Sequence, residues 1–317
     1  MDALIGHTGF VGQNLASQHS FAATFNSSNI DDAAGRKFDI VVCAAASATM
    51  WAANKDPDGD RAKIDGLIEQ LRRIAAGRFV LISTIAVLDT ANAGYTESLA
   101  RYEREKAYGR NRRALETAIE SIFPQSHILR LPALFGRGLK KNFLFDILHP
   151  TPSFLTPAKL DDIVAHLPPR QADLVRDAYR YDDALAMYAF ARDRYDGTSA
   201  GRSIEAAFFQ AGFTALNFVN PESTYQYYGL DALWSDIRTC IKNDLTVMHL
   251  ATEPLRAGDI YATLTGESLP TNDASLYYED MRTEHGRAWG TPGPYIESGE
   301  HVLSQLKQFY TAERRAA

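Results

Sequence analysis

The chain has 317 residues, of which 45% are hydrophobic and 23% are charged, and its formal net charge is -6. This is the composition of a globular protein with a sizeable core, in one large domain or two smaller ones. A negative net charge argues against nucleic acid as a partner, because a nucleic-acid-binding face needs clustered cations. Cys43 and Cys240 lie far apart and outside any CxxC motif, which argues against a disulfide framework and a structural zinc site.

The N-terminal segment has no basic leader, and no apolar stretch is long enough to span a membrane. We therefore expect a cytoplasmic protein without membrane contact. The eight histidines show no HExxH or comparable spacing, so no metal site is predicted. The GxSxG turn of many hydrolases and the GxxxxGK[ST] phosphate loop are also missing from the sequence.

Short apolar runs alternate with amphipathic segments through the first half of the chain. The runs typical of buried strands are DALI, FDIVVCAAAS, RFVLISTIAVL and SHILRLPALFG. Between them, residues 60–76 show apolar residues at helical spacing, and a second helical pattern runs from about Leu99 to Ile122. Apolar strands separated by amphipathic helices predict a doubly wound α/β fold, with a parallel sheet covered on both faces.

The second half of the chain is less regular, and five prolines between positions 150 and 169 separate its helical segments. FTALNFVNP is predicted to return to the sheet, YGLDALWSDIRTCIKN to form a helix, and the tail to end in another helix. We predict a sheet domain formed by residues 1–150 and about 203–250. A smaller, discontinuous C-terminal part comprises about 151–202 and 251–317.

A glycine-rich turn follows the first predicted strand in LIGHTGFVG. Gly6, Gly9 and Gly12 are spaced three apart, after a strand and before a helix. In such a turn the first glycine allows a tight bend, the second lets a pyrophosphate approach the backbone, and the third lets helix and strand pack closely. Free N–H groups at the helix N-terminus then favour the phosphates. Spaced glycines can also mark a plain turn, but this position after the first strand predicts a dinucleotide site.

The segment ATFNSSNID lies where dinucleotide sites often carry an acid that binds the adenosine ribose. It has Asn26, Ser27 and Ser28 at the expected place. Without that acid a 2′-phosphate is not repelled, although no arginine follows before Arg36. Both NAD and NADP are therefore candidates, with NADP slightly favoured.

Five motifs together give the chain a family resemblance over about residues 1–140. In order and spacing, the chain resembles the extended short-chain dehydrogenase/reductase family, the NAD(P)-dependent epimerase/dehydratase group, in GHTGFVG, FDIVVCAAAS, VLISTIAVL, AYGRNRRALE and ILRLPALFGRG. Many members of that family act on nucleotide-linked sugars. The resemblance implies a Rossmann fold, an NAD(P) cofactor, a sugar or sugar-nucleotide substrate bound by the smaller part, and a homodimer.

The resemblance also implies roles for individual residues. The implied cofactor contacts are Gly6, Thr8, Gly9, Phe10, Val11, Gly12, Asn26, Ser27, Ala44, Ala45, Ala46, Ser83, Tyr108, Arg112 and Leu131. The implied catalytic residues are Thr84, Tyr108 and Arg112, and the implied substrate contacts are Thr84, Asn142 and Gln226. The sequence departs from the family at Arg112, where the YxxxK motif has lysine, and at Ala133, where an asparagine often contacts the sugar nucleotide.

Tyr108 and Arg112 are one helical turn apart, so their side chains can meet on one face. A tyrosine needs a pKa about three units below its usual 10 to act as a base at neutral pH, and a cation about 4 Å away can supply that roughly 4 kcal/mol. A planar guanidinium nevertheless differs from a compact ammonium, and Glu116 can draw it away from the tyrosine. The pair therefore suits carbonyl reduction, in which the tyrosine donates a proton, better than fast oxidation. Thr84 would hydrogen-bond the same carbonyl oxygen of the substrate.

Other interpretations of these motifs stay open. A Y-x-x-x-R pattern in a charged helix is also typical of a solvated face, and Ser83 and Thr84 can simply cap a turn. The predicted function is that of an NAD(P)-dependent oxidoreductase or epimerase/dehydratase-type enzyme acting on a sugar or nucleotide-sugar hydroxyl or ketone. The alternative is a dinucleotide-binding sensor or scaffold without turnover, which Arg112 favours.

Overall fold

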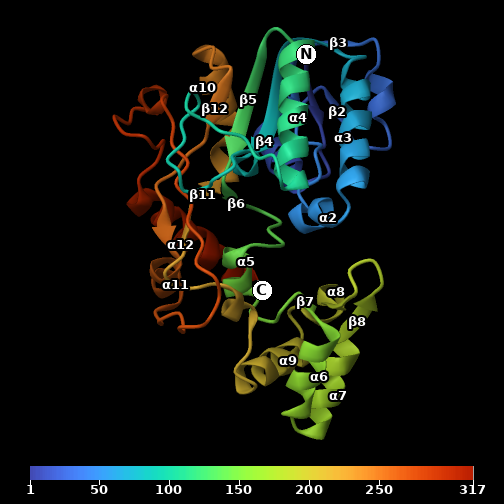
Figure 1. The fold of residues 1–317 in the computed structure, drawn as a ribbon, viewed down its shortest axis with the longest axis vertical. Helices are drawn as coiled ribbons and strands as arrows, with labels where there is room; N and C mark the ends of the chain where they lie inside the picture. Colours follow the sequence, from blue (N-terminus) through green and yellow to red (C-terminus); the bar gives the residue numbers. More distant parts are fainter. Residues whose placement is uncertain (317) are drawn as a thin grey trace. The chain divides into compact units, whose positions relative to one another are not determined.

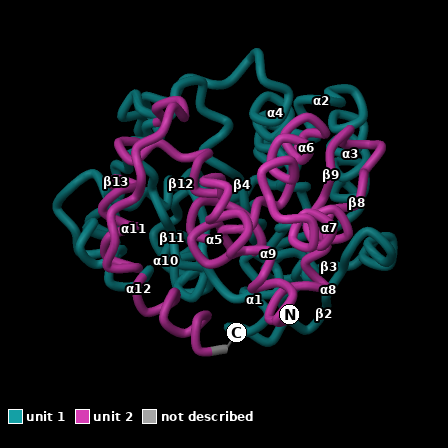
Figure 2. The backbone as a smooth tube through the Cα atoms, turned by 90° about the horizontal axis from the view of Figure 1, so that it is seen from below, with its two compact units in different colours: residues 1–139, 224–255, 278–306 teal, residues 140–223, 256–277, 307–317 magenta. Residues whose placement is uncertain are grey.

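The computed structural model describes residues 1–316 (Figure 1). The chain divides into two compact units (Figure 2). Unit 1 comprises Met1–Leu139, Thr224–Leu255 and Tyr278–Leu306. Unit 2 comprises Lys140–Ser223, Arg256–Tyr277 and the segment from Lys307 onward. Each unit is therefore assembled from segments that are far apart in the sequence.

The predicted division differs from these units in four places. Residues 140–150 and 203–223 belong to unit 2, and residues 251–255 and 278–306 belong to unit 1. The physical reason is burial: Ile204 and Phe208 lie in the core of unit 2, whereas Met281 and Ile296 lie in the cores of unit 1.

A six-stranded parallel sheet forms the centre of unit 1. Its strand order is β12-β5-β4-β3-β1-β2, and every pair of neighbouring strands is parallel. The strands are β1 (Asp2–Ile5), β2 (Ala23–Phe25), β3 (Lys37–Cys43), β4 (Ala75–Thr84), β5 (Ser126–Leu131) and β12 (Val247–His249). With helices on both faces, this arrangement confirms the predicted doubly wound α/β fold.

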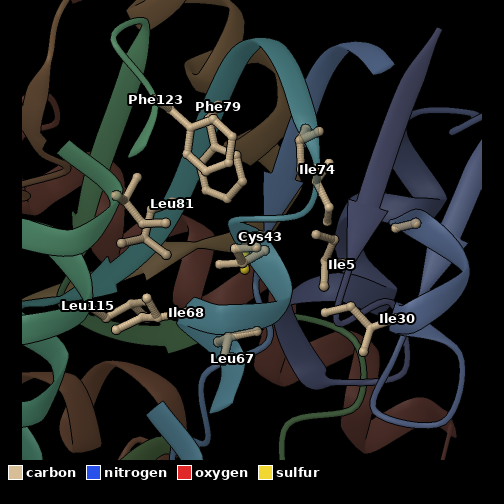
Figure 3. Close-up of a cluster of buried hydrophobic side chains, with 14 of the residues drawn as sticks. Ile5, Ile30, Cys43, Leu67, Ile68, Ile74, Phe79, Leu81, Leu115 and Phe123 are labelled. Atoms are coloured by element: carbon tan, nitrogen blue, oxygen red, sulfur yellow. The ribbon is translucent and has the colours of Figure 1, made fainter. Parts of the chain in front are cut away.

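Alternate residues of the inner strands enter two separate cores, because successive side chains of a strand point to opposite faces. On one face, helices α3 (Pro57–Leu71) and α4 (Ala107–Ile122) lie side by side, and Leu115 packs with Cys43 and Leu81 (Figure 1; Figure 3). On the other face, helices α1 (Phe10–Gln18) and α10 (Leu233–Lys242) contribute to a second core. The strand residues in this core alternate along each strand with those of the first core. The members of that core from strands and helices include Val42, Val80, Leu129, Leu15 and Ile237.

The direction of the strand order reverses at β1. Between β2 and β3 the chain makes only a short 3₁₀ turn, η1 (Ile30–Ala33), and β3 then pairs on the other side of β1. In open α/β sheets, ligands bind outside the carboxyl ends of the strands at such a reversal. The topology therefore directs attention to the ends of β1 and β3.

The remaining elements of unit 1 are short. They are α2 (Met50–Lys55), η2 (Ile85–Val87), β6 (Ala133–Phe135), β10 (Thr224–Tyr225), β11 (Tyr227–Gly229), η4 (Leu230–Ala232) and η5 (Gly286–Trp289). Strand β6 pairs with β11, and β10 pairs with β13 (Leu255–Arg256). The chain ends in α12 (Gly299–Ala316), and none of the helices in residues 1–316 combines the length and apolarity needed to cross a membrane.

Unit 2 combines helices with a small antiparallel sheet of order β7-β9-β8. Its elements are α5 (Phe143–Leu148), β7 (Phe154–Leu155), α6 (Pro157–Ala165), α7 (Pro169–Ala178), β8 (Tyr179–Asp182), β9 (Met187–Phe190), α8 (Arg192–Tyr195), α9 (Ser199–Gln210), η3 (Ala215–Phe218) and α11 (Ala257–Thr265). Leu160, Val175 and Phe208 are among the residues of its core, to which α6, α7 and α9 all contribute.

The helix expected from Leu99 begins only at Ala107, so that prediction was wrong at its start. The preceding residues are held by other bonds. The Glu103 N–H donates to the Val87 carbonyl at 2.9 Å, and the Glu103 carboxylate accepts from the N–H of Glu105 and of Lys106. These contacts compete with helical hydrogen bonds and fix an extended approach to α4.

The return strand expected in FTALNFVNP was also wrong, because this segment forms the 3₁₀ turn η3. The N–H of Leu216 donates to the Thr214 hydroxyl, and the Thr214 N–H donates to the Asn217 side chain at 2.7 Å. This reciprocal cap favours a helical turn over an extended strand.

Candidate active site

The glycine turn lies where β1, β2 and β3 end. Gly6 has φ +89°, and its N–H donates to the Phe25 carbonyl at 2.7 Å. A Cβ at Gly6 would lie 2.5 Å from the Ala44 carbonyl oxygen, and a Cβ at Gly12 would lie 2.1 Å from the Gly6 oxygen. Only glycine fits such approaches, so the turn, the start of α1 and the end of β3 are locked together.

The start of α1 is open to a ligand. Gly9 is its exposed N-cap, no side chain caps the first-turn N–H groups, and a Cβ at Gly9 would make only an ordinary contact. Thr8 is exposed beside it, whereas Phe10 and Val11 pack partly against the core and anchor the turn. Uncapped N–H groups at a helix N-terminus can bind a phosphate.

The turn after β2 carries no carboxylate at its tip. The side-chain oxygen of Asn26 accepts from the N–H and the hydroxyl of Ser28, at 2.9 and 2.6 Å. Ser27 is exposed, and the next acid, Asp31, pairs with Arg73 at 3.0 Å. The predicted residues Asn26 and Ser27 thus form a compact polar turn next to the glycine turn.

The residues expected to border the cofactor at the other strand ends differ in exposure. Ala44, Ala45 and Ala46 are half-buried beyond β3, where small side chains leave the strand end accessible. Leu131, at the end of β5, pairs with Thr84 in register but is 2% exposed and lies in the core. The Leu131 side chain is therefore used in packing.

Tyr108 is buried near the start of α4, where its N–H donates to the Asn54 side chain at 2.9 Å. The guanidinium carbon of Arg112 lies 4.4 Å from the centre of the Tyr108 ring. Burial raises the pKa of Tyr108 above its ordinary value of 10, and the charge and hydrogen bond of Arg112 and the Thr84 hydroxyl oppose this change without cancelling it. The phenol is therefore protonated at neutral pH and can donate a proton.

Arg112 is 3% exposed, and its guanidinium is held by groups outside the predicted site. Its Nη1 donates to the Asp60 carboxylate at 2.7 Å, and its Nη2 donates to the Ser47 carbonyl. Its buried Nε has no hydrogen-bond partner within residues 1–316. The expected competitor, Glu116, is not the residue that pairs with Arg112: Asp60 is.

Glu116 instead forms a fully buried ion pair with Arg130. Two nitrogens of Arg130 donate to the two carboxylate oxygens of Glu116, at 3.0 and 2.7 Å, and both side chains are 0% exposed. The Ser83 hydroxyl donates to Glu116 at 2.5 Å, and Arg113 donates to it at 2.9 Å. Ser83 is thus bound to this pair, which leaves Thr84 as the hydroxyl that acts on Tyr108.

The two remaining predicted substrate contacts, Gln226 and Asn142, make hydrogen bonds within their own units. Gln226, in unit 1, is 0% exposed; its amide nitrogen donates to the carbonyls of Thr252 and Met281, and its amide oxygen accepts from the Met281 N–H. The predicted contact of Gln226 with substrate therefore lacks a free donor. Asn142, in unit 2, caps α5 by accepting from the Phe145 N–H at 3.2 Å.

A cavity of about 550 Å³ opens in unit 2. Helices α5, α9, α11 and the end of α12 line it, with Glu205, Phe209, Tyr261 and Arg314 among the lining side chains, and none of the predicted site residues does so. In the described part of the chain, no group of three or more His, Cys, Asp or Glu side chains is arranged to hold a metal ion.

The sequence did not single out Asp60, Arg130 or His249 for this region. One signal for Arg130 was present: an arginine inside the apolar strand SHILRL requires a buried partner. His249 provides one contact, since its Nε2 lies 3.0 Å from a guanidinium nitrogen of Arg130. Asp60 has no comparable signal, because an acid in the first turn of a helix is common on the surface.

Comparisons with known proteins give a likeness in structure only, since no family model and no curated protein sequence matches the chain. RMD from Pseudomonas aeruginosa, solved with NADPH, has 14% identity and a TM-score of 0.61 over 100% of this chain and 99% of its own. The dTDP-4-dehydrorhamnose reductase from Bacillus anthracis str. Ames, solved with NADP, has 13% identity and a TM-score of 0.60 over 98% and 97%.

A third solved structure is a variant of UDP-glucuronic acid 4-epimerase from Bacillus cereus, in complex with a fluorinated UDP-sugar and NAD. It has 11% identity and a TM-score of 0.61 over 100% of both chains. At such identities the likeness establishes the fold. The chain shares the fold of these NAD(P)-bound structures, which is the fold of the extended short-chain dehydrogenases/reductases that its motifs predict.

Proposed function

We propose that the chain is an NAD(P)-dependent oxidoreductase that reduces a ketone of a sugar or nucleotide sugar. The observation that carries this proposal is the buried, protonated phenol of Tyr108, held beside the Thr84 hydroxyl and the Arg112 guanidinium near the carboxyl edge of the sheet. The substrate class is supported by solved structures of the same fold, whose names are those of a nucleotide-sugar reductase and an epimerase.

The glycine turn fits the diphosphate of a dinucleotide. The N-terminus of α1 is uncapped by side chains, Gly9 is exposed, and the close contacts of Gly6 and Gly12 fix the turn. When bound, the dinucleotide supplies the hydride for the carbonyl carbon. The turn at Asn26 to Ser28 has no acid to repel a 2′-phosphate, which favours NADP over NAD.

Tyr108 and Thr84 act on the carbonyl oxygen in this proposal. As that oxygen gains negative charge, Tyr108 gives it the phenolic proton and the Thr84 hydroxyl stabilises it by a hydrogen bond. The product is an alcohol, and the tyrosinate left behind faces the charge of Arg112 until water restores its proton. The raised pKa keeps the resting phenol in the protonated form with which a reduction begins, whereas an oxidation begins from the tyrosinate, so reduction is the favoured direction.

Purified protein tests the proposal directly. Oxidation of NADPH or NADH is followed by absorbance with a panel of keto nucleotide sugars, and Tyr108→Phe should lower kcat/KM by about 10²- to 10⁴-fold because it removes the proton donor. Tyr181→Phe, on an exposed tyrosine of unit 2, is the matched control and should retain the activity. Equal activity of the Tyr108→Phe variant and the control would contradict the proposal.

A second candidate function is a dinucleotide-binding sensor without turnover. It is favoured by the guanidinium of Arg112, which is committed to Asp60 and Ser47, so that the ribose contact of the family lysine is not reproduced. Tight binding of NADPH, measured by fluorescence, together with no oxidation across the panel would support the sensor and end the reductase proposal. The expected homodimer stays a prediction, to be checked by light scattering.

A further inference from the structure

Three neighbours hold the guanidinium of Arg112 in one orientation. It donates to the Asp60 carboxylate from one nitrogen and to the Ser47 carbonyl from another, and its central carbon lies 4.4 Å from the centre of the Tyr108 ring. Asp60 lies on α3, Tyr108 and Arg112 lie on α4, and Ser47 follows the alanines at the end of β3. Asp60 thus reaches Tyr108 through the guanidinium of Arg112, to which its carboxylate is hydrogen-bonded.

We propose that Asp60 is a positioning residue that fixes the guanidinium of Arg112 against Tyr108 and, by its own charge, keeps the tyrosine a proton donor rather than a base. This inference rests on the proposed function for the role given to Tyr108. It adds a determinant of the direction of proton transfer, supplied by a helix that carries none of the predicted site residues.

Asp60 is built to remain an anion. Burial by itself raises the pKa of its carboxyl group, but hydrogen bonds from Arg112 and Asn111 and the charges of Arg112 and Lys63 outweigh it, and the net pKa lies below the ordinary value. Asn111 donates to the same oxygen as Arg112, at 2.9 Å. The carboxylate also lies in the first turn of α3, where the helix dipole favours negative charge.

The charge of Asp60 opposes the charge of Arg112 at the phenol. The groups that act on Tyr108 are Arg112 from its own helix, Asp60 from α3 and the Thr84 hydroxyl from the end of β4. Arg112 and Thr84 favour the tyrosinate, whereas Asp60 disfavours it. Asp60 therefore neutralises the charge of Arg112. Arg112 still stabilises the tyrosinate that forms during a reduction, but it does not ionise Tyr108 before the reaction begins.

A purely structural ion pair makes a different prediction. If Asp60 only joined α3 to α4, its removal would lower the stability of the chain and leave the ionisation of Tyr108 unchanged. The two roles are therefore separated by titrating Tyr108 itself, and Asp60→Asn is suited to this because asparagine keeps the shape and one acceptor oxygen.

The experiment places 3,5-difluorotyrosine at position 108 of the full chain, so that one ¹⁹F NMR signal reports the phenol and its ionisation falls within a mild pH range. Asp60→Asn should move the titration midpoint to lower pH, and a midpoint that is lower by one pH unit means about a tenfold gain in tyrosinate at fixed pH. The matched control is Asp58→Asn, which removes the same charge from the same turn of α3 at an exposed position. It should leave the midpoint in place.

A second variant covers the case in which Asp60→Asn does not fold. The double change Asp60→Asn with Arg112→Gln removes both charges and leaves a neutral pair, and its midpoint should lie above that of the unchanged protein, since the effect of Arg112 exceeds that of Asp60. The proposal would be overturned by a midpoint that is unchanged or raised in Asp60→Asn, or by equal midpoint changes in Asp60→Asn and Asp58→Asn. A midpoint of the double variant at or below that of the unchanged protein would also overturn it. The titration uses no cofactor or substrate. If the protein showed no turnover, the proposed function would fail, but the titration midpoints of the variants could still be compared.

Discussion

Helix α4 carries one member of each of two buried ion pairs, and the two pairs differ in how completely their polar groups are satisfied. Arg130 meets Glu116 through two parallel hydrogen bonds, and Ser83 and Arg113 also donate to Glu116. Arg112 meets Asp60 through one hydrogen bond, and in the described chain its buried Nε has no partner.

The difference shows how one helix can serve both stability and chemistry. A closed, fully bonded network holds its members rigidly and has no donor to spare. Both guanidinium groups lie over a tyrosine ring, Arg130 at 5.1 Å from the centre of the Tyr102 ring and Arg112 at 4.4 Å from that of Tyr108, but only Arg112 lies beside the proposed proton donor. The Glu116 pair is therefore the one expected to dominate stability.

Removing Glu116 should have the largest effect on stability. Glu116→Ala leaves Arg130 buried without its counter-charge, so the free energy of unfolding should fall by about 3–5 kcal/mol. Asp60→Ala is the matched comparison and should cost less, about 3 kcal/mol, because the Asp60 carboxylate accepts two side-chain hydrogen bonds whereas that of Glu116 accepts four. Urea unfolding measures both, and a larger loss for Asp60→Ala would reverse the comparison.

The two pairs should also respond to acid in separate pH ranges. Burial lowers the pKa of His249 below 6.5, and the adjacent charge of Arg130 adds to this. His249 is therefore neutral in the fold but protonated in the unfolded chain below about pH 6.5, so stability is full above that pH. It should fall as the pH drops toward the folded pKa, by at most about 1.4 kcal/mol per pH unit.

The pH dependence is checked by urea unfolding between pH 4 and 7.5. His249→Gln should flatten the slope below pH 6.5. Asp60→Asn should leave that slope unchanged: the folded pKa of Asp60 lies below 3.8, so its contribution is lost only in stronger acid. An unchanged slope in His249→Gln would show that protonation of His249 beside Arg130 does not cause the loss of stability.

Ser83→Ala should have the smallest effect. It removes one donor at 2.5 Å from Glu116, but the guanidinium bonds of Arg130 and Arg113 remain, so the loss in unfolding free energy should be about 1 kcal/mol. A loss as large as that of Glu116→Ala, in the same urea experiment, would show that the hydroxyl is essential to the network.

The local features of the site were accessible from sequence, and its long-range pairs were not. The spacing of Gly6 and Gly12 after an apolar run predicts their turn, because turn chemistry is decided by neighbouring residues. The partners of Arg112 and Arg130 lie on other elements, at Asp60 and His249, and nothing in the local pattern specifies which distant polar groups meet. The predicted start of α4 was wrong for the same reason, because hydrogen bonds to the segment after β4 take the place of the expected first helical turns.

The two outer strands of the large sheet have a consequence for how copies of the protein meet. β2 and β12 are each three residues long, about 10 Å at the usual rise per residue. An outer strand has unpaired backbone N–H and C=O groups that can hydrogen-bond to a strand of another molecule, and a short outer strand has few of them. The sheet is therefore poorly suited to growth by strand addition at high concentration, and association between copies should use helices or loops instead.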